Sequence, residues 1–412
     1  MHGSAVSRVS KELTLFFIIV AMTGLSMGMT DNVISNYFKD AYNVTAAQRG
    51  FLELPREGPG VICMFVVAAS AAIGDVRVSI ISQFLSLTGA LVLGLFTPSF
   101  AVMSLFIFIN SLGNHVYLPL QDSIGMSIIG DKDLGRRMGQ YSGIRTAFQM
   151  IANIIVFIGF KAGVFSFKTQ IKMPFLLGAA GFSVVLFLYV FLLVRYKVYG
   201  EKRKGKFQLI FRKKYTLYYI IAVMTGVHRQ IMMVFGPWVL IEILKQGADT
   251  LSLLGIVAFF FGTLTLPLIG RWIDRFGTRI ILLAEGFVFL FVYLVYGFIS
   301  NGLVLGKMSK VGLPLYIIAA LYIVDRLSMQ LSIVRTAYLK SIAIDPADIT
   351  PTLSTGLSMD HVVSITCAMY GGVFWTTYGP HIVFYTAAAL SLINIISALL
   401  IKQAPKTAPA VG

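Results

Sequence analysis

Residues 174–214 read PFLLGAAGFSVVLFLYVFLLV and then RYKVYGEKRKGKFQLIFRKK, and this stretch decides the class of fold. Its first 21 residues contain no charge, and a helix needs about 20 apolar residues to cross a bilayer. Its last 20 residues hold nine Lys or Arg and one acid, a composition typical of a solvated linker. The stretch therefore predicts a membrane-spanning helix that ends in a basic connection.

Apolar runs of similar length lie on both sides of this stretch. They predict twelve spans, over residues 13–36, 51–73, 78–96, 99–125, 138–160, 174–194, 215–240, 251–272, 279–300, 312–338, 353–377 and 380–401. We expect a first six-helix half over residues 1–194, a basic linker over 195–214 and a second six-helix half over 215–412. Continuous apolar runs exclude a membrane β-barrel, whose strands alternate in hydrophobicity. The sequence thus predicts an all-α polytopic membrane protein with twelve transmembrane helices.

The composition of the whole chain agrees with lipid as its solvent. Of 412 residues, 57% are hydrophobic and 13% are charged, and the mean hydropathy is +0.81. A soluble domain carries about 25% charged residues. The net charge of +16 comes mostly from basic residues in short gaps between apolar runs, so we expect no nucleic-acid partner. Cys63 and Cys367 lie inside predicted spans and offer neither a disulfide framework nor a metal-binding spacing.

The distribution of basic residues predicts the topology. If both termini and the linker share one side of the membrane, that side receives 21 of the 34 Lys and Arg and the other side receives 8. Because basic loops stay in the cytoplasm, both termini are expected to be cytoplasmic, with the protein in the cytoplasmic (plasma) membrane. The apolar run from Leu13 is longer than the core of a signal peptide, about 7–15 residues, so we interpret it as a retained first span.

After the eighth predicted span the chain reads GRWIDRFGTR, residues 270–279. This segment resembles the G-x-x-x-D-R-x-G-x-R signature of the major facilitator superfamily, which lies in cytoplasmic loops of that family. The resemblance implies two pseudo-symmetric halves and a gating role for Gly270, Asp274, Arg275, Gly277 and Arg279. The equivalent place after span two keeps only Asp75 and Arg77 of the pattern.

Charged residues inside the spans are the second functional signal. Each charge at the centre of a membrane helix costs about 3 kcal/mol, so these groups must face one another or a wet cavity. They are Arg56, Arg145, Arg229, Arg326, Arg335, Asp31, Glu57, Asp122, Asp325 and Asp360. Glu285 is expected to be the structural partner of a loop arginine. For Glu53 and the pair Arg56-Glu57, a structural network at the start of a helix and a contact with solute both remain open.

Helical spacing gathers these and other polar residues into stripes. Examples are Asn110, Asn114, Tyr117 and Gln121 in span four, and Gly24, Gly28, Asp31 and Ser35 in span one. The resemblance implies that spans one, four, seven and ten line a central cavity. The predicted substrate- or proton-binding residues are Asp31, Asn114, Gln121, Arg145, Gln149, His228, Arg229, Asp325, Arg326, Gln330, Asp360 and His361. Adjacent residues on a helix point about 100° apart, so Asp360 and His361 are not expected to share a metal ion.

These features predict a secondary active transporter that works by alternating access on a small polar solute such as an organic anion, a zwitterion or a sugar. Protons are favoured over sodium as the coupling ion, because several carboxylates and histidines lie at depth. No Walker loop is present, and neither an enzymatic activity nor a cofactor is expected. The protein is expected to be a monomer in the bilayer. The alternatives are an exporter of amphipathic drug-like compounds and a non-transporting membrane receptor on the same scaffold. Residues 145–153 lack the Gly-Pro pair of drug antiporters in that family, which counts against the exporter.

The topology is tested with single cysteines at positions 165 and 205 of a variant that lacks Cys63 and Cys367. An impermeant thiol reagent should label position 165 from outside the cell and position 205 only after the membrane is opened, because the first lies in a predicted outer loop and the second in the linker. Labelling of both positions from the same side would contradict the topology.

Overall fold

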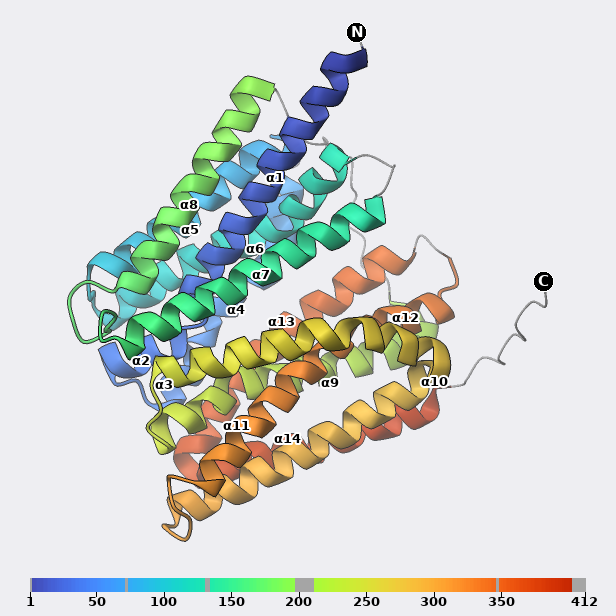
Figure 1. The fold of residues 1–412 in the computed structure, drawn as a ribbon. Coiled ribbons are helices and arrows are strands. Elements are labelled where there is room, and N and C mark those ends of the chain that lie inside the picture. Colours follow the sequence, from blue (N-terminus) through green and yellow to red (C-terminus); the bar gives the residue numbers. More distant parts are fainter. Residues whose placement is uncertain (1, 71–72, 130–133, 197–210, 346–347, 402–412) are drawn as a thin grey trace. The chain divides into compact units, whose positions relative to one another are not determined.

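The computed structural model describes residues 2–70, 73–129, 134–196, 211–345 and 348–401, and their regular elements are all helical (Figure 1). Helices overlap each of the twelve predicted spans, which confirms the all-α class. Within this part of the chain nine helices are long and apolar enough to cross a membrane. The other three predicted spans depart from that pattern for visible reasons. Span two is only 17 residues of helix, span ten is interrupted, and span eleven is rich in polar residues.

The chain divides into two compact units, of which unit 1 comprises Met1–Phe207 and Leu240–Phe259, and unit 2 comprises Gln208–Val239 and Phe260–Gly412. Unit 1 contains α1 (His2–Asp31), α2 (Ile34–Tyr42), α3 (Ala46–Phe51), α4 (Glu53–Ala69), α5 (Asp75–Leu95), α6 (Phe100–Ile129), α7 (Leu134–Lys161), α8 (Met173–Phe191) and η1 (Leu192–Tyr196). It also takes η3 (Val239–Ile243) from Leu240 onward and the start of α10 (Ala248–Val304). Most of the predicted linker, residues 197–210, lies outside the described residues, so the three predicted segments stay a prediction.

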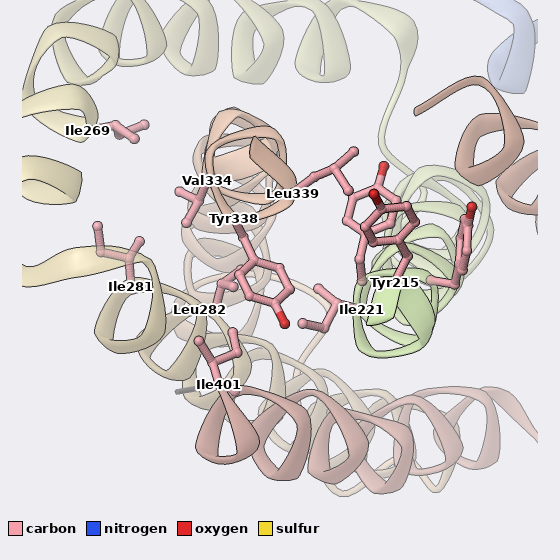
Figure 2. Close-up of a cluster of buried hydrophobic side chains, with 12 residues drawn as sticks. Tyr215, Ile221, Ile269, Ile281, Leu282, Val334, Tyr338, Leu339 and Ile401 are labelled. Atoms are coloured by element: carbon pink, nitrogen blue, oxygen red, sulfur yellow. The ribbon is translucent and has the colours of Figure 1, made fainter. Parts of the chain in front are cut away.

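Unit 2 is built around α9 (Thr216–Trp238), which packs against α13 (Ile349–Tyr378) and α14 (Pro380–Leu400). The tenth span is broken into α11 (Leu313–Ser328), the 3-10 turn η4 (Met329–Leu331) and α12 (Ser332–Ile342). Spans eight and nine run together as α10, with a kink at Gly277. Figure 2 shows a buried cluster of this unit, in which the Tyr338 ring lies among Ile221, Leu282 and Ile401.

Close packing of α1 on α7 depends on two glycines of the predicted stripe in span one. A Cβ at Gly24 would lie 2.6 Å from the carbonyl oxygen of Arg145, and a Cβ at Gly28 would lie 2.6 Å from the Cβ of Ala152. Small residues let membrane helices approach until their backbones touch. The residues of this stripe therefore have different roles. Gly24 and Gly28 allow the contact between helices, whereas Asp31 is exposed.

A network of polar contacts centred on the carboxylate of Asp348 lies at the end of unit 2 that the predicted topology places in the cytoplasm. Arg212 binds this carboxylate through two nitrogens, with Nη2 2.9 Å from Oδ1 and Nε 2.8 Å from Oδ2. Tyr215 at the end of η2 (Lys213–Tyr215) donates to Oδ2 at 2.6 Å, and its hydroxyl accepts from the amide of Ile344 at 2.9 Å. The hydrogen bond from Tyr215, followed by those from Arg212, holds the pKa of Asp348 below its ordinary value.

Gly24→Ala should destabilise the protein by about 1–3 kcal/mol, the usual cost of overpacking. The added methyl would overlap backbone that cannot rotate away. Gly143→Ala on α7 is the matched control, because a Cβ there meets no atom within 4 Å. Thermal unfolding in detergent checks both, and equal melting temperatures for the two variants would contradict the packing.

Asp348→Asn should lower the melting temperature at neutral pH but not in acid. A carboxyl whose pKa is depressed by folding stabilises the protein above its unfolded pKa of about 3.9, and this stabilisation is lost as the pH falls through the folded value. The difference between wild type and variant should therefore shrink below about pH 4. Asp345→Asn, an exposed acid of the same loop, is the control.

The thiol-labelling experiment gains a better outer position from the structure. Phe165 is buried, whereas the neighbouring side chain of Val164 is 66% exposed. A cysteine at position 164 is therefore accessible to the thiol reagent, and the buried Phe165 side chain stays in place.

Candidate functional site

Arg229 on α9 and Asp360 on α13, both predicted as site residues, form an ion pair within unit 2. Arg229 Nη2 lies 2.6 Å from Asp360 Oδ2, and the two side chains are 34% and 13% exposed. Gly226 lies one turn before Arg229, and a Cβ there would overlap Asp360 Oδ1. The pair is thus built into the helix contact yet keeps one side open, which suits a charge that can exchange partners.

Asp325 and Arg326 are neighbours on α11 but lie in different surroundings. Asp325 is 2% exposed, and its Oδ1 makes no hydrogen bond within the described residues. Arg326 Nη2 donates to the hydroxyl of Tyr322 at 3.0 Å, and its guanidinium lies 5.0 Å from the centre of that ring. The charges of Arg326 and Glu285 both act on Asp325. Asp325 is therefore a buried carboxylate under the opposing influence of a cation and another acid.

Glu285 pairs with Arg335, which is a span arginine and not a loop arginine. Arg335 Nη1 lies 3.5 Å from Glu285 Oε1, and the side chains are 18% and 3% exposed. The sequence therefore identified the structural role of Glu285 and missed its partner. Helical spacing gives the face of a residue but not the neighbouring helix that the face meets.

His228 lies in the interior of unit 2. Its imidazole stacks between Phe289 and Tyr293, with ring centres 4.7 and 5.2 Å away, and the Tyr293 hydroxyl donates to the His228 carbonyl at 3.0 Å. The side chain is fully buried, so it does not share the open side of Arg229. His361 is buried next to Asp360 in sequence, and the side chain of Gln330 lies outside the described residues.

The polar stripe of α6 is used mainly to hold α5 within unit 1. Asn114 Oδ1 accepts from Ser86 Oγ at 2.9 Å, and Asn110 Nδ2 donates to the Ser86 carbonyl at 2.7 Å. Gln121 is fully buried. The structure therefore places Asn114 in a helix contact, and the role in a cavity that the family resemblance implied for it stays a prediction.

Arg145 and Gln149 lie on α7 at the contact with α1. The guanidinium of Arg145 lies 5.7 Å from the centre of the Tyr141 ring, whose hydroxyl donates to Asp122. The carbonyl of Gln149 accepts from Asn153 Nδ2 at 3.2 Å. Close to them is a pocket of about 520 Å³, lined by Phe17, Gln140, Gly143, Ile144 and Ala147.

A second charged cluster in unit 1 contains Arg49, which the sequence did not single out, and Glu53, for which it left a structural network and a solute contact open. Both are fully buried and form an ion pair. Glu53 Oε1 also accepts from Arg56 Nη1 at 2.7 Å, and Arg56 Nη2 lies 3.8 Å from Glu57 Oε1. The predicted site residue Asp31 is exposed, and its charge acts on Arg56 and Glu57. The signal that could have revealed the cluster is the spacing Arg49, Glu53, Arg56, which fits one helical face.

Gly277 of the segment predicted to act as a gate, residues 270–279, lies at the kink of α10. Gly277 has φ 79° and ψ 163°, a region that only glycine occupies without strain. Gly74 before α5 adopts φ 94° and ψ 142°. The equivalent segment after span two, which keeps only Asp75 and Arg77 of the motif, therefore also has a glycine turn. Arg275, Arg77 and Arg279 are exposed or half-buried, whereas Asp75 is buried and accepts from Ser123.

Within the same segment, the backbone at Gly270 and Asp274 is helical, and the side chain of Asp274 lies outside the described residues.

Comparison with known proteins agrees with this architecture. A family model described as Major Facilitator Superfamily matches residues 16–343, and no curated protein matches the chain by sequence. The nucleoside transporter NupG superposes with a TM-score of 0.72 at 13% identity, covering 94% of this chain and 98% of its own. An auto-inhibited peptide transporter of the POT family has a TM-score of 0.71 at 12% identity, covering 97% and 99%. A POT family transporter in complex with 5-aminolevulinic acid also has a TM-score of 0.71 at 12% identity, covering 95% of both chains. At these identities the likeness concerns the fold alone.

Proposed function

The chain belongs to the Major Facilitator Superfamily, and from that premise we propose that it carries a small polar solute across the plasma membrane by proton-coupled alternating access. The observation that carries the proposal is the Arg229–Asp360 ion pair, which is formed at 2.6 Å and still partly exposed. The solute is an organic anion, a zwitterion or a sugar. The nucleoside and peptide transporters with the same fold support a polar solute.

Arginine cannot lose its charge at accessible pH, so Arg229 needs an anionic or hydroxyl-bearing partner in every state of a transport cycle. Asp360 supplies that partner in this structure. A solute group that binds Arg229 would release Asp360, whose charge would then have to be solvated or protonated. Arg145 and Arg326 are proposed to bind solute in the same manner, each from a position beside a tyrosine ring.

Asp325 is proposed as the main proton site. A carboxylate so deeply buried is costly as an anion, so a change in its surroundings during transport would favour proton uptake or release. Protons are preferred over sodium for this reason. The gating segment at residues 270–279 is proposed to open and close the cytoplasmic end, with both termini on that side.

An exporter of amphipathic compounds is the second candidate. The observation in its favour is the pocket beside α1 and α7, whose lining includes Phe17, Ile144 and Ala147. The span arginines fit an apolar compound poorly, because such a compound offers no anionic or hydroxyl group to replace a partner such as Asp360. We therefore place the polar solute first.

Asp325→Asn should allow exchange of solute across the membrane while abolishing uphill accumulation, because an amide mimics the protonated acid permanently. The solute is first identified by a thermal-shift screen of metabolites on the purified protein, since a ligand of the folded state raises its stability. Counterflow and gradient-driven uptake are then measured in proteoliposomes. Asp40→Asn, an exposed acid of α2, is the control. Normal accumulation by Asp325→Asn under a proton gradient would exclude Asp325 as the coupling site.

A further inference from the structure

We propose that Arg56 of unit 1 is an anion-binding residue, and that Glu57 is the internal carboxylate that the anionic group of a ligand replaces. The inference rests on the proposed function, because it names a second contact for the solute. It concerns a cluster whose role the sequence left open between a structural network and a solute contact.

One edge of the Arg56 guanidinium is fixed. Its Nη1 donates to Glu53 Oε1 at 2.7 Å, and Glu53 is held in turn by Arg49. Both of these partners are fully buried, and Arg49 donates to Ser35 Oγ at 3.4 Å. The backbone of Arg56 is also anchored, because its carbonyl accepts from Ser111 Oγ of α6. The arginine is therefore positioned by groups that do not need to move when a ligand arrives.

The other edge of the guanidinium is held loosely. Arg56 Nη2 lies 3.8 Å from Glu57 Oε1, which is longer than a hydrogen bond of about 3.2 Å. The Arg56 side chain is 15% exposed, compared with none of Glu53. A guanidinium binds carboxylate or phosphate best through two parallel hydrogen bonds. The Arg56 edge that faces Glu57 has such donors, and among the described residues they meet only this long contact.

This edge of Arg56 is only partly open to solvent, since the Arg56 side chain is 15% exposed and Glu57 itself is buried. Asp31 at the end of α1 is exposed, and its charge acts on both Arg56 and Glu57. A ligand can therefore reach Arg56 on the side where Asp31 lies. The opposite side is closed by the buried Arg49–Glu53 pair.

The charges of the cluster indicate what accompanies the anion. Arg49 and Arg56 face the three carboxylates Glu53, Glu57 and Asp31, so the ionised cluster has one excess negative charge. Among the described residues of unit 1, the polar groups packed on it include Ser35 of α2 and, on α6, Ser111 with His115, whose Nδ1 lies 3.0 Å from Ser111 Oγ. An entering anion would add a second negative charge. A proton on the displaced Glu57 restores the balance, so anion and proton would enter together.

A purely structural network makes the opposite prediction for Glu57. If Glu57 only braces the start of α4, its removal leaves anion binding unchanged or weakens it. If Glu57 competes with the ligand for Arg56, its removal strengthens binding. The sign of the effect therefore separates the two roles.

The test uses the purified full-length protein and the shift in melting temperature caused by sodium acetate, lactate, succinate, phosphate or sulfate, with chloride at equal ionic strength as the reference. Wild type should be stabilised by at least one of these anions, and comparison of the carboxylates with phosphate identifies the preferred oxyanion. Glu57→Gln should bind that anion several-fold more tightly, and Arg56→Gln should bind it about tenfold more weakly or not at all. Lys161→Gln, an exposed residue at the end of α7, should bind as wild type does.

If Arg56→Gln fails to fold, Arg56→Lys keeps the charge but loses the planar fork, and it should bind measurably more weakly than wild type. The proposal is overturned if no anion stabilises wild type, if Glu57→Gln binds more weakly, or if both Arg56 variants bind normally. Those results leave the proposed transporter intact, with Arg229 and not Arg56 as the residue that meets the solute. Failure of transport with the expected pattern of anion binding would instead contradict the proposed function and leave this site standing.

Discussion

An arginine inside a bilayer keeps its charge and must be given a partner, because an isolated charge at the centre of a membrane helix costs about 3 kcal/mol or more. This constraint determines how the polar residues of each unit are arranged. In unit 2 it places Asp360 against Arg229 and Glu285 against Arg335. In unit 1 it assembles Arg49, Glu53 and Arg56 at the start of α4. Removal of one partner would leave a buried charge at Arg49–Glu53 and a partly exposed one at Arg229–Asp360.

The packing of the helices serves the same requirement. Charged side chains can meet only if the helices that carry them approach closely, and small residues make that approach possible. Gly226 makes room for Asp360, and Gly24 brings α1 against the backbone of Arg145. Charge pairing and helix contact are therefore coupled. A substitution of a contact glycine should disturb the ion pair, and a substitution in the ion pair should disturb the helix contact.

The sequence predicted the architecture well and the site only in part. Apolar runs predict the positions of the helices, because a helix needs about 20 apolar residues to cross the bilayer. Helices overlap all twelve of the predicted spans. Gly277, a glycine of the motif, lies at the kink between the eighth and ninth predicted spans. The surroundings of individual residues were harder to predict, because helical periodicity shows which face of a helix a residue lies on but not which other helix packs against that face. Asn114 faces Ser86 and His228 lies between two aromatic rings, although both belong to helices expected to line a cavity. Arg49 was overlooked because it lies in α3, a helix of six residues before the second span.

The pairing of Arg229 with Asp360 is measured most directly by a double-mutant cycle on the free energy of unfolding, with Arg229→Gln, Asp360→Asn and the double variant. Because the pair is only partly exposed, each single change is expected to cost about 1–3 kcal/mol, between the values for exposed and buried pairs, and the double variant should lose less than the sum of the two. A coupling energy of about 1 kcal/mol or more would support the account. Additive effects, within about 0.5 kcal/mol, would show that the two residues do not neutralise one another and would contradict it.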